Sequence, residues 1–137
     1  MLTIQSSDNF NQKEIRELFS SVGWAQNLSD DLLYKAILNS SHFVTARIDG
    51  KLVGIARSMD DNIWSANIDC VVVHSKYQNC GIAKSMINEL THQLSHIQFI
   101  NVAPNSKESF SLYLNNGFEL IEESRLFQID NTKGEQE

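Results

Sequence analysis

The segment from Gln78 to Lys84, Gln-Asn-Cys-Gly-Ile-Ala-Lys, combines residue types that suit phosphate binding. It follows the apolar run Val71–Val73 and precedes an amphipathic stretch, so the pattern predicts a strand, a turn and a helix start. The first N–H groups of a helix lack partners and lie at the positive end of its dipole, which favours an anion. Gly81 and Ala83 leave room for a diphosphate to approach the backbone. An alternative is that Gly81 only makes a tight turn between strand and helix.

This turn resembles the acyl-coenzyme A signature of the GNAT superfamily of N-acetyltransferases, (Gln/Arg)-x-x-Gly-x-(Gly/Ala), filled here as Gln78-x-x-Gly81-x-Ala83. A later segment, Tyr113-Leu-Asn-Asn-Gly117-Phe118, is similar to the family's Tyr-x-x-x-Gly-Phe. Together these segments cover roughly the central and C-terminal two-thirds of the chain. The resemblance implies the GNAT acyl-CoA N-acyltransferase fold, an α+β fold whose mixed, mostly antiparallel sheet has about six to seven strands and about four flanking helices.

The resemblance also implies an activity. An acetyl-CoA-dependent N-acetyltransferase passes an acetyl group to a primary amine of a small-molecule or peptide acceptor, by direct attack in a ternary complex. The strand before the signature and the strand after its helix are expected to splay apart and admit the pantetheine arm. The residues expected to contact coenzyme A are Val71, Val72 and Val73 on the strand, and Gln78, Asn79, Cys80, Gly81, Ile82, Ala83 and Lys84 on the turn and helix.

Tyr113 lies where the family has a tyrosine that protonates the leaving thiolate. The chemistry is consistent, because a phenol with a pKa of about 10 is protonated at neutral pH and a free thiol has a pKa of about 8.5. The alternative is a half-buried helix aromatic whose hydroxyl simply finds a partner.

The general base is less clearly marked. Relatives often carry an acidic residue on the strand before the signature, but alignment on Gln78 puts Cys70 there. Asp69 is one position away and would face the opposite side of an ideal strand, although a β-bulge would re-aim it. We therefore take Asp69 as the candidate base, with a carboxylate that only supports the sheet as the alternative. His74 has a suitable intrinsic pKa, but relatives use a histidine there for structure.

Three further residues follow from the family pattern. Many relatives have an asparagine seven positions before the tyrosine that contacts the cofactor; Ser106 occupies this position, with Asn105 beside it, and either is a candidate contact. Trp24 lies before the second predicted helix, where the family forms its acceptor pocket. It is either a stacking platform for a cationic amine or a core residue.

Composition limits the class of protein. The 137 residues, with 42% hydrophobic residues and one proline, suit one domain over 1–137 with a frayed tail at 131–137. No apolar run is long enough to span a membrane and no secretory signal is apparent, so we expect a cytoplasmic protein without membrane partners. The net charge of −6 argues against nucleic acid, and the two cysteines and four histidines suggest no metal site. A homodimer is a reasonable expectation because the C-terminal strands of relatives often pair.

The elements that position these residues can be predicted from capping, turn and periodicity signals. Asn11 with Glu14 predicts a helix start, Gly23 its end, and Asp49-Gly50 a tight hairpin turn. Expected helices cover 29–37, 80–94 and 107–116; expected strands cover 2–5, 43–48, 52–59, 63–73, 97–102, 118–122 and 126–129.

Two rival functions fit parts of the same pattern. An acyl-CoA-binding or sensing module of the same fold is favoured by Cys70 at the position of the strand acid and by Ser106. A nucleotide-phosphate site of another α/β fold is disfavoured, because the chain lacks Gly-x-Gly-x-x-Gly and the Gly-x-x-x-x-Gly-Lys-(Ser/Thr) loop.

Overall fold

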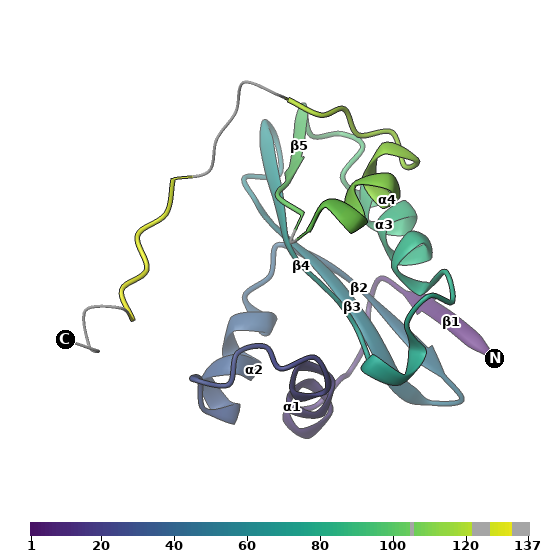
Figure 1. The fold of residues 1–137 in the computed structure, drawn as a ribbon, viewed down its shortest axis with the longest axis vertical. Helices are drawn as coiled ribbons and strands as arrows, with labels where there is room; N and C mark the ends of the chain where they lie inside the picture. The colour runs from purple at the N-terminus through teal and green to yellow at the C-terminus, as the bar shows by residue number, and fades with distance from the viewer. Residues whose placement is uncertain (105, 122–126, 133–137) are drawn as a thin grey trace.

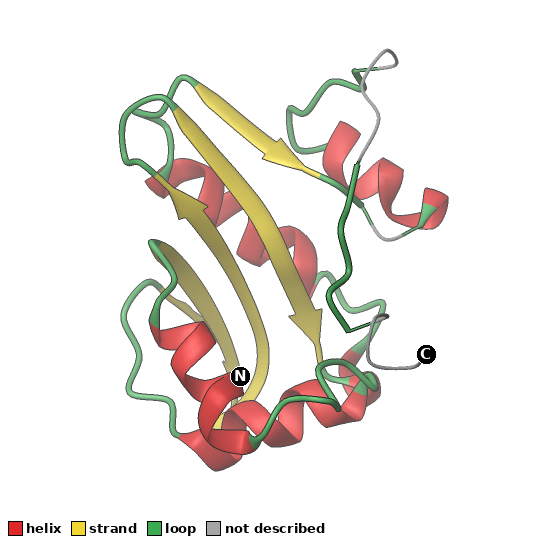
Figure 2. Ribbon diagram, turned by 90° about the vertical axis from the view of Figure 1, so that its left-hand side faces the viewer, coloured by secondary structure: helices red, strands yellow, loops and turns green. Residues whose placement is uncertain are grey.

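The computed structural model describes residues 1–104, 106–121 and 127–132. One sheet with strand order β1-β2-β3-β4-β5 forms the centre of the fold, and helices cover both of its faces (Figures 1 and 2). The elements are β1 (Leu2–Gln5), α1 (Gln12–Ser21), α2 (Asp30–Leu38), β2 (His42–Ile48), β3 (Lys51–Asp60), β4 (Ser65–Val73), η1 (Ser75–Tyr77), α3 (Ile82–Gln93), β5 (Phe99–Val102), η2 (Lys107–Ser109) and α4 (Phe110–Leu114).

The helix caps and the hairpin turn in the first part of the chain form where the sequence predicted them. Asn11 and Glu14 form a reciprocal capping box at the start of α1, and the Ser29 hydroxyl accepts a hydrogen bond from an amide of α2. Asp49 and Gly50 both have positive φ, at 49° and 85°, so the turn between β2 and β3 is the tight type that suits twisted antiparallel strands.

Two apolar clusters hold the layers together. On one face, α1 and α2 pack Ile15, Leu18 and Ile37 against Ile55 and Val72. On the other face, α3 covers the sheet with the buried side chains Met86, Ile87 and Leu90, together with its C-cap residue Leu94. Figure 1 shows α1 and α2 on one side of the sheet, with α3 and α4 on the other. The sheet thus lies between two helical layers.

The pairing of the last strands creates an opening in the sheet. Strands β1 to β4 are antiparallel, whereas β4 and β5 run parallel and pair only from Ser65–Phe99 to Ile68–Val102. Beyond Ile68, β4 continues to Val73 and pairs only with β3 within the described part of the chain. The main chain of this half of β4 therefore presents a free edge.

The C-terminal part departs from the sequence prediction. Residues 118–121 and 127–129 are not in strands, and residues 122 and 126, which complete the two expected strands, lie outside the described residues. The described ranges thus contain five strands rather than six or seven. Alternating apolar residues specify a strand only where a neighbouring edge receives it. The amide of Phe118 donates instead to the carbonyl of Tyr113, and the side chain of Phe127 is exposed.

The remaining differences are small. The helix expected over 107–116 is divided into η2 and α4, and the helix expected from residue 80 begins at Ile82. Of the expected tail 131–137, residues 131 and 132 form a turn and 133–137 lie outside the described ranges. Within those ranges, none of the helices has the length and apolar character needed to cross a membrane.

Candidate active site

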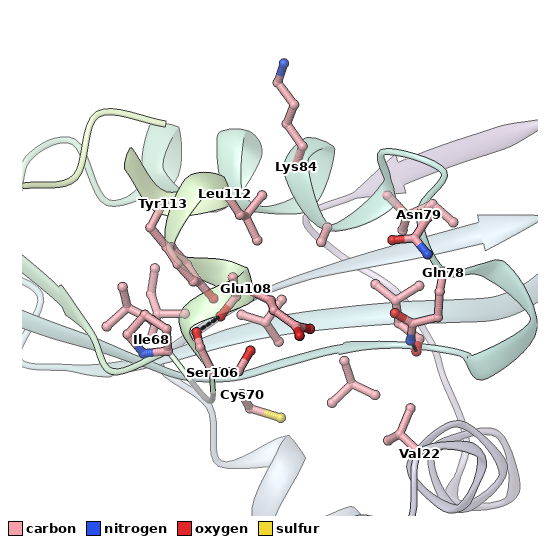
Figure 3. A pocket seen from close by; sticks show the side chains of 18 of the residues that line it. Val22, Ile68, Cys70, Gln78, Asn79, Lys84, Ser106, Glu108, Leu112 and Tyr113 are labelled. Atoms are coloured by element: carbon pink, nitrogen blue, oxygen red, sulfur yellow. Dashed lines mark hydrogen bonds between the residues drawn. The ribbon is translucent and has the colours of Figure 1, made fainter. Parts of the chain in front are cut away.

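A cleft of about 480 Å³ lies where β4 and β5 separate. Its walls come from β4, the turn between β4 and α3, the first turn of α3, and the segment from β5 to α4 (Figure 3). Its volume is in the range of small-molecule and cofactor sites. Most residues that the sequence predicted for cofactor binding line this cleft: Val71, Val72, Val73, Gln78, Asn79, Gly81, Ile82, Ala83, Lys84 and Ser106.

Two predicted contacts are not among the lining residues, and a third, Lys84, lines the cleft without directing its side chain into it. Cys80 is exposed and is not among the lining residues, and Asn105 lies outside the described residues. The Lys84 side chain extends away from the cleft in Figure 3. Any contribution of Lys84 to the lining therefore comes from its part near the backbone.

The turn before α3 has the geometry of an anion cradle. Gly81 is the N-cap of α3 with φ of 80°, and an added Cβ there would meet no atom within 4 Å, so it would project into open space. The amides of residues 78–84 have no acceptor within the described part of the chain. Such a run of free N–H groups at a helix start fits the diphosphate of coenzyme A.

Gln78 has a structural contact in this turn. Its side-chain Nε2 donates to the carbonyl of Val73 at 2.6 Å. The signature glutamine therefore holds the turn against the end of β4. As a result, the free amides of the turn and the free edge of the strand border the same cleft.

A β-bulge re-aims the candidate base. Arg57 of β3 pairs with Cys70 and Ser58 pairs with Ile68, so Asp69 is the extra, unpaired residue between them. The alternation of side chains reverses here: Ile68 packs beneath α3, whereas Cys70 packs beneath α1 and α2. Asp69 is consequently on the same side as Cys70, where its side chain is 46% exposed and its carboxylate pairs with the Arg57 guanidinium.

The thiol of Cys70, the residue next to Asp69, is buried and uncharged. Burial raises the pKa of Cys70 to about 12, so the group is a neutral thiol at pH 7. Cys70 therefore cannot serve as a thiolate nucleophile or as a base in the resting protein. Among the residues of this bulge, Asp69 is the one with a carboxylate.

Tyr113 faces the cleft from α4. Tyr113 is only 8% exposed, and its ring packs edge-on against that of Phe118 with the ring centroids 5.5 Å apart. Burial raises the pKa of the Tyr113 phenol, so the proton remains on oxygen at neutral pH. Its hydroxyl has no hydrogen-bond partner among the described residues, and Figure 3 shows the ring directed from α4 towards the cleft. The site thus contains a protonated donor that is unengaged within the described part of the chain.

His74 and Trp24 are two further residues for which the sequence suggested both a functional and a structural role. His74 is buried, its Nδ1 accepts a hydrogen bond from the amide of Lys76, and burial lowers its pKa. It therefore caps η1 as a neutral ring. Trp24 is half-buried and lines the cleft, and it also lines a second pocket between β4 and the α1–α2 layer.

Sequence reasoning missed two charged residues near the site. Arg57, the partner of Asp69, lies on β3, and its proximity depends on a strand register that no local pattern specifies. Glu108 lines the cleft in the segment that follows Ser106. Its closeness in sequence to Ser106 is the signal that could have identified it.

Comparisons with known proteins agree with the fold and the signature. A family model described as an acetyltransferase (GNAT) domain matches residues 7–128. An uncharacterized N-acetyltransferase of Pyropia yezoensis is 32% identical over an alignment of 104 residues that covers 72% of this chain, and a counterpart from Porphyra purpurea is 29% identical with the same coverage. The chain spans about three-fifths (59%) of the length of each of these relatives.

Solved structures share the architecture. A GNAT-family acetyltransferase from Streptococcus pneumoniae superposes with a TM-score of 0.80 at 22% identity, covering 95% of this chain and 98% of its own. An acetyltransferase from Trypanosoma brucei superposes with a TM-score of 0.69 at 19% identity, covering 95% of this chain and 99% of its own. The match over residues 7–128 confirms the resemblance read from the signature turn. The chain belongs to the GNAT acetyltransferase family.

Proposed function

We propose that this chain transfers an acetyl group from acetyl-coenzyme A to a primary amine, by direct attack of the amine in a ternary complex. One observation carries the proposal: a single cleft joins the free amides of the turn before α3 to the Tyr113 hydroxyl and the bulged Asp69. Phosphate-binding, proton-donating and proton-accepting groups thus line one space.

Binding is assigned to the backbone. Acetyl-coenzyme A supplies an activated acetyl group as a thioester. The amides around Gly81 bind the diphosphate, and the free edge of β4 from Val71 to Val73 offers main-chain groups to an extended chain, apart from the Val73 carbonyl, which accepts from Gln78. Ser106, at the opposite wall of the cleft, is a further candidate contact.

Two side chains move the protons. Asp69 accepts the proton that the attacking amine loses, either directly or through a water molecule. Tyr113 donates its phenolic proton to the departing thiolate, and its raised pKa keeps that proton in place until then. The neutral thiol of Cys70 disfavours an acyl-enzyme route, which supports direct attack by the acceptor.

Initial-rate kinetics test this function. The protein is incubated with acetyl-coenzyme A and a panel of primary amines, free thiol is measured, and the acetylated amine is identified by mass spectrometry. We expect thiol release that depends on the amine, with intersecting double-reciprocal lines, as a ternary complex requires. Coenzyme A binding without thiol release across the panel would contradict the proposal and favour a binding or sensing module.

A further inference from the structure

A second pocket of about 440 Å³ lies between β4 and the α1–α2 layer. It shares Trp24, Asp69 and Cys70 with the coenzyme A cleft, so the two spaces meet at the β-bulge. An amine at the bulge would have the cleft on one side of it and this second pocket on the other.

The walls of the second pocket are apolar. Phe19, Leu33 and Ile37 are buried, and Leu28 of the loop between α1 and α2 completes the far side. The pocket therefore offers a dry surface to an alkyl or aryl group, which gains stability when it leaves water.

The loop that forms this wall is held in place by one arginine. The Arg16 guanidinium donates to the carbonyl of Ala25 at 3.1 Å and to the carbonyl of Leu28 at 2.5 Å, and it pairs with Asp30 at 2.6 Å. These contacts come from the middle of α1 and tie the loop to the helix. The pocket is thus preformed, which lowers the cost of binding.

Charge in the second pocket is limited to one pair. Arg57 and Asp69 are the charged residues among its lining, and they bind each other. An acceptor ammonium at the bulge can approach the exposed part of Asp69. A second ammonium deeper in the pocket would find no carboxylate among the described lining residues, and it would lose its hydration without compensation.

We propose that the second pocket holds the apolar body of the acceptor, so that the acceptor is a monoamine with an alkyl or aryl group and its nitrogen lies at Asp69. This inference rests on the proposed acetyl transfer, since it names the class of amine for that reaction. Apolar lining, a single available carboxylate and continuity with the cleft all point to the same occupant.

A matched pair of amines tests the assignment. Pentylamine and putrescine have chains of equal length and differ in whether the far end is a methyl or an ammonium group. Their Kd values are measured by calorimetry with coenzyme A present, and kcat/KM by thiol release. We expect pentylamine to be favoured by about tenfold or more in both measurements.

Two variants sharpen the test. Leu28→Glu adds a carboxylate to the pocket wall and is expected to shift the Kd ratio towards putrescine by about tenfold. Leu32→Glu makes the same change at a residue of α2 that is 54% exposed and does not line the pocket, and it should leave the ratio unchanged. Circular dichroism confirms folding, and the wild-type pair decides the matter if Leu28→Glu does not fold.

The outcomes separate the two proposals. Equal or tighter binding of putrescine by the wild type, binding of neither amine, or equal ratios in the two variants would overturn the monoamine assignment. Preferential binding of pentylamine without any thiol release would support the pocket assignment and contradict the proposed acetyl transfer.

Discussion

Asp69 of β4 pairs with Arg57 of β3 at the point where a β-bulge interrupts the register of the two strands. Arg57 also donates from Nη1 to the carbonyl of Ala36 in α2 at 3.1 Å. The carboxylate that we assign as the base is therefore fixed between the sheet and the acceptor side of the molecule. This position lets one residue border both the cleft and the second pocket.

Replacement of this carboxylate tests the base role. Asp69→Asn keeps the size of the side chain but removes its charge, so we expect kcat to fall by about a hundredfold or more. The Kd for coenzyme A should stay within about twofold of the wild type, because the phosphate-binding amides are unaffected. Asp31→Asn, at an exposed i,i+4 pair on α2, is the matched control and should retain full turnover. Full turnover in Asp69→Asn would remove Asp69 from the mechanism.

The glycine of the turn allows stability and binding to be separated. Gly81 and Gly50 have φ of 80° and 85°, and an added Cβ meets no atom within 4 Å at either position. Alanine at either site should therefore cost about 1–2 kcal/mol of unfolding free energy from left-handed strain, measured by urea denaturation.

Only Gly81→Ala places its methyl group in the proposed diphosphate cradle. We expect it to weaken coenzyme A binding by about tenfold or more, the equivalent of one lost hydrogen bond to a charged group, while Gly50→Ala leaves the Kd unchanged. Equal Kd values for the two variants would show that the turn is not the phosphate site.

Thiol chemistry tests the environment of the bulge. The raised pKa of Cys70, about 12, leaves a thiolate fraction of about one in ten thousand at pH 8. Cys80 is exposed, so iodoacetamide should label Cys80 and spare Cys70 in the folded protein. Peptide mass mapping in buffer and in denaturant checks this. Labelling of Cys70 at the rate of Cys80 without denaturant would mean that the bulge is open to solvent.

The sequence allowed prediction of the parts of the site that depend on local signals. The turn at Gly81, the capping box at Asn11 and the hairpin turn at Gly50 each arise from residues close together in the chain, so their conformations follow from residue type. Tyr113, which was identified from the family motif, lines the cleft, and its role there stays a prediction.

Other features depend on contacts between distant segments. The direction of Asp69 follows from the register of β4 against β3, and its pairing with Arg57 follows from the same register. The sequence offered a bulge only as one possibility because residue type does not specify which position is unpaired. The expected strand at residue 118 fails for a related reason, because an apolar pattern does not specify whether the segment pairs with an edge of the sheet.

The most direct test of the central claim is the turnover of Tyr113→Phe at saturating acetyl-coenzyme A, followed by free-thiol release. This variant keeps the ring that packs on Phe118 and removes only the hydroxyl that faces the cleft. Tyr34→Phe, which removes a hydroxyl from the α1–α2 side, serves as the control. We predict that kcat of Tyr113→Phe falls by about a hundredfold with an unchanged Kd for coenzyme A. Full turnover of Tyr113→Phe with an efficient acceptor would contradict the assignment of Tyr113 as the acid.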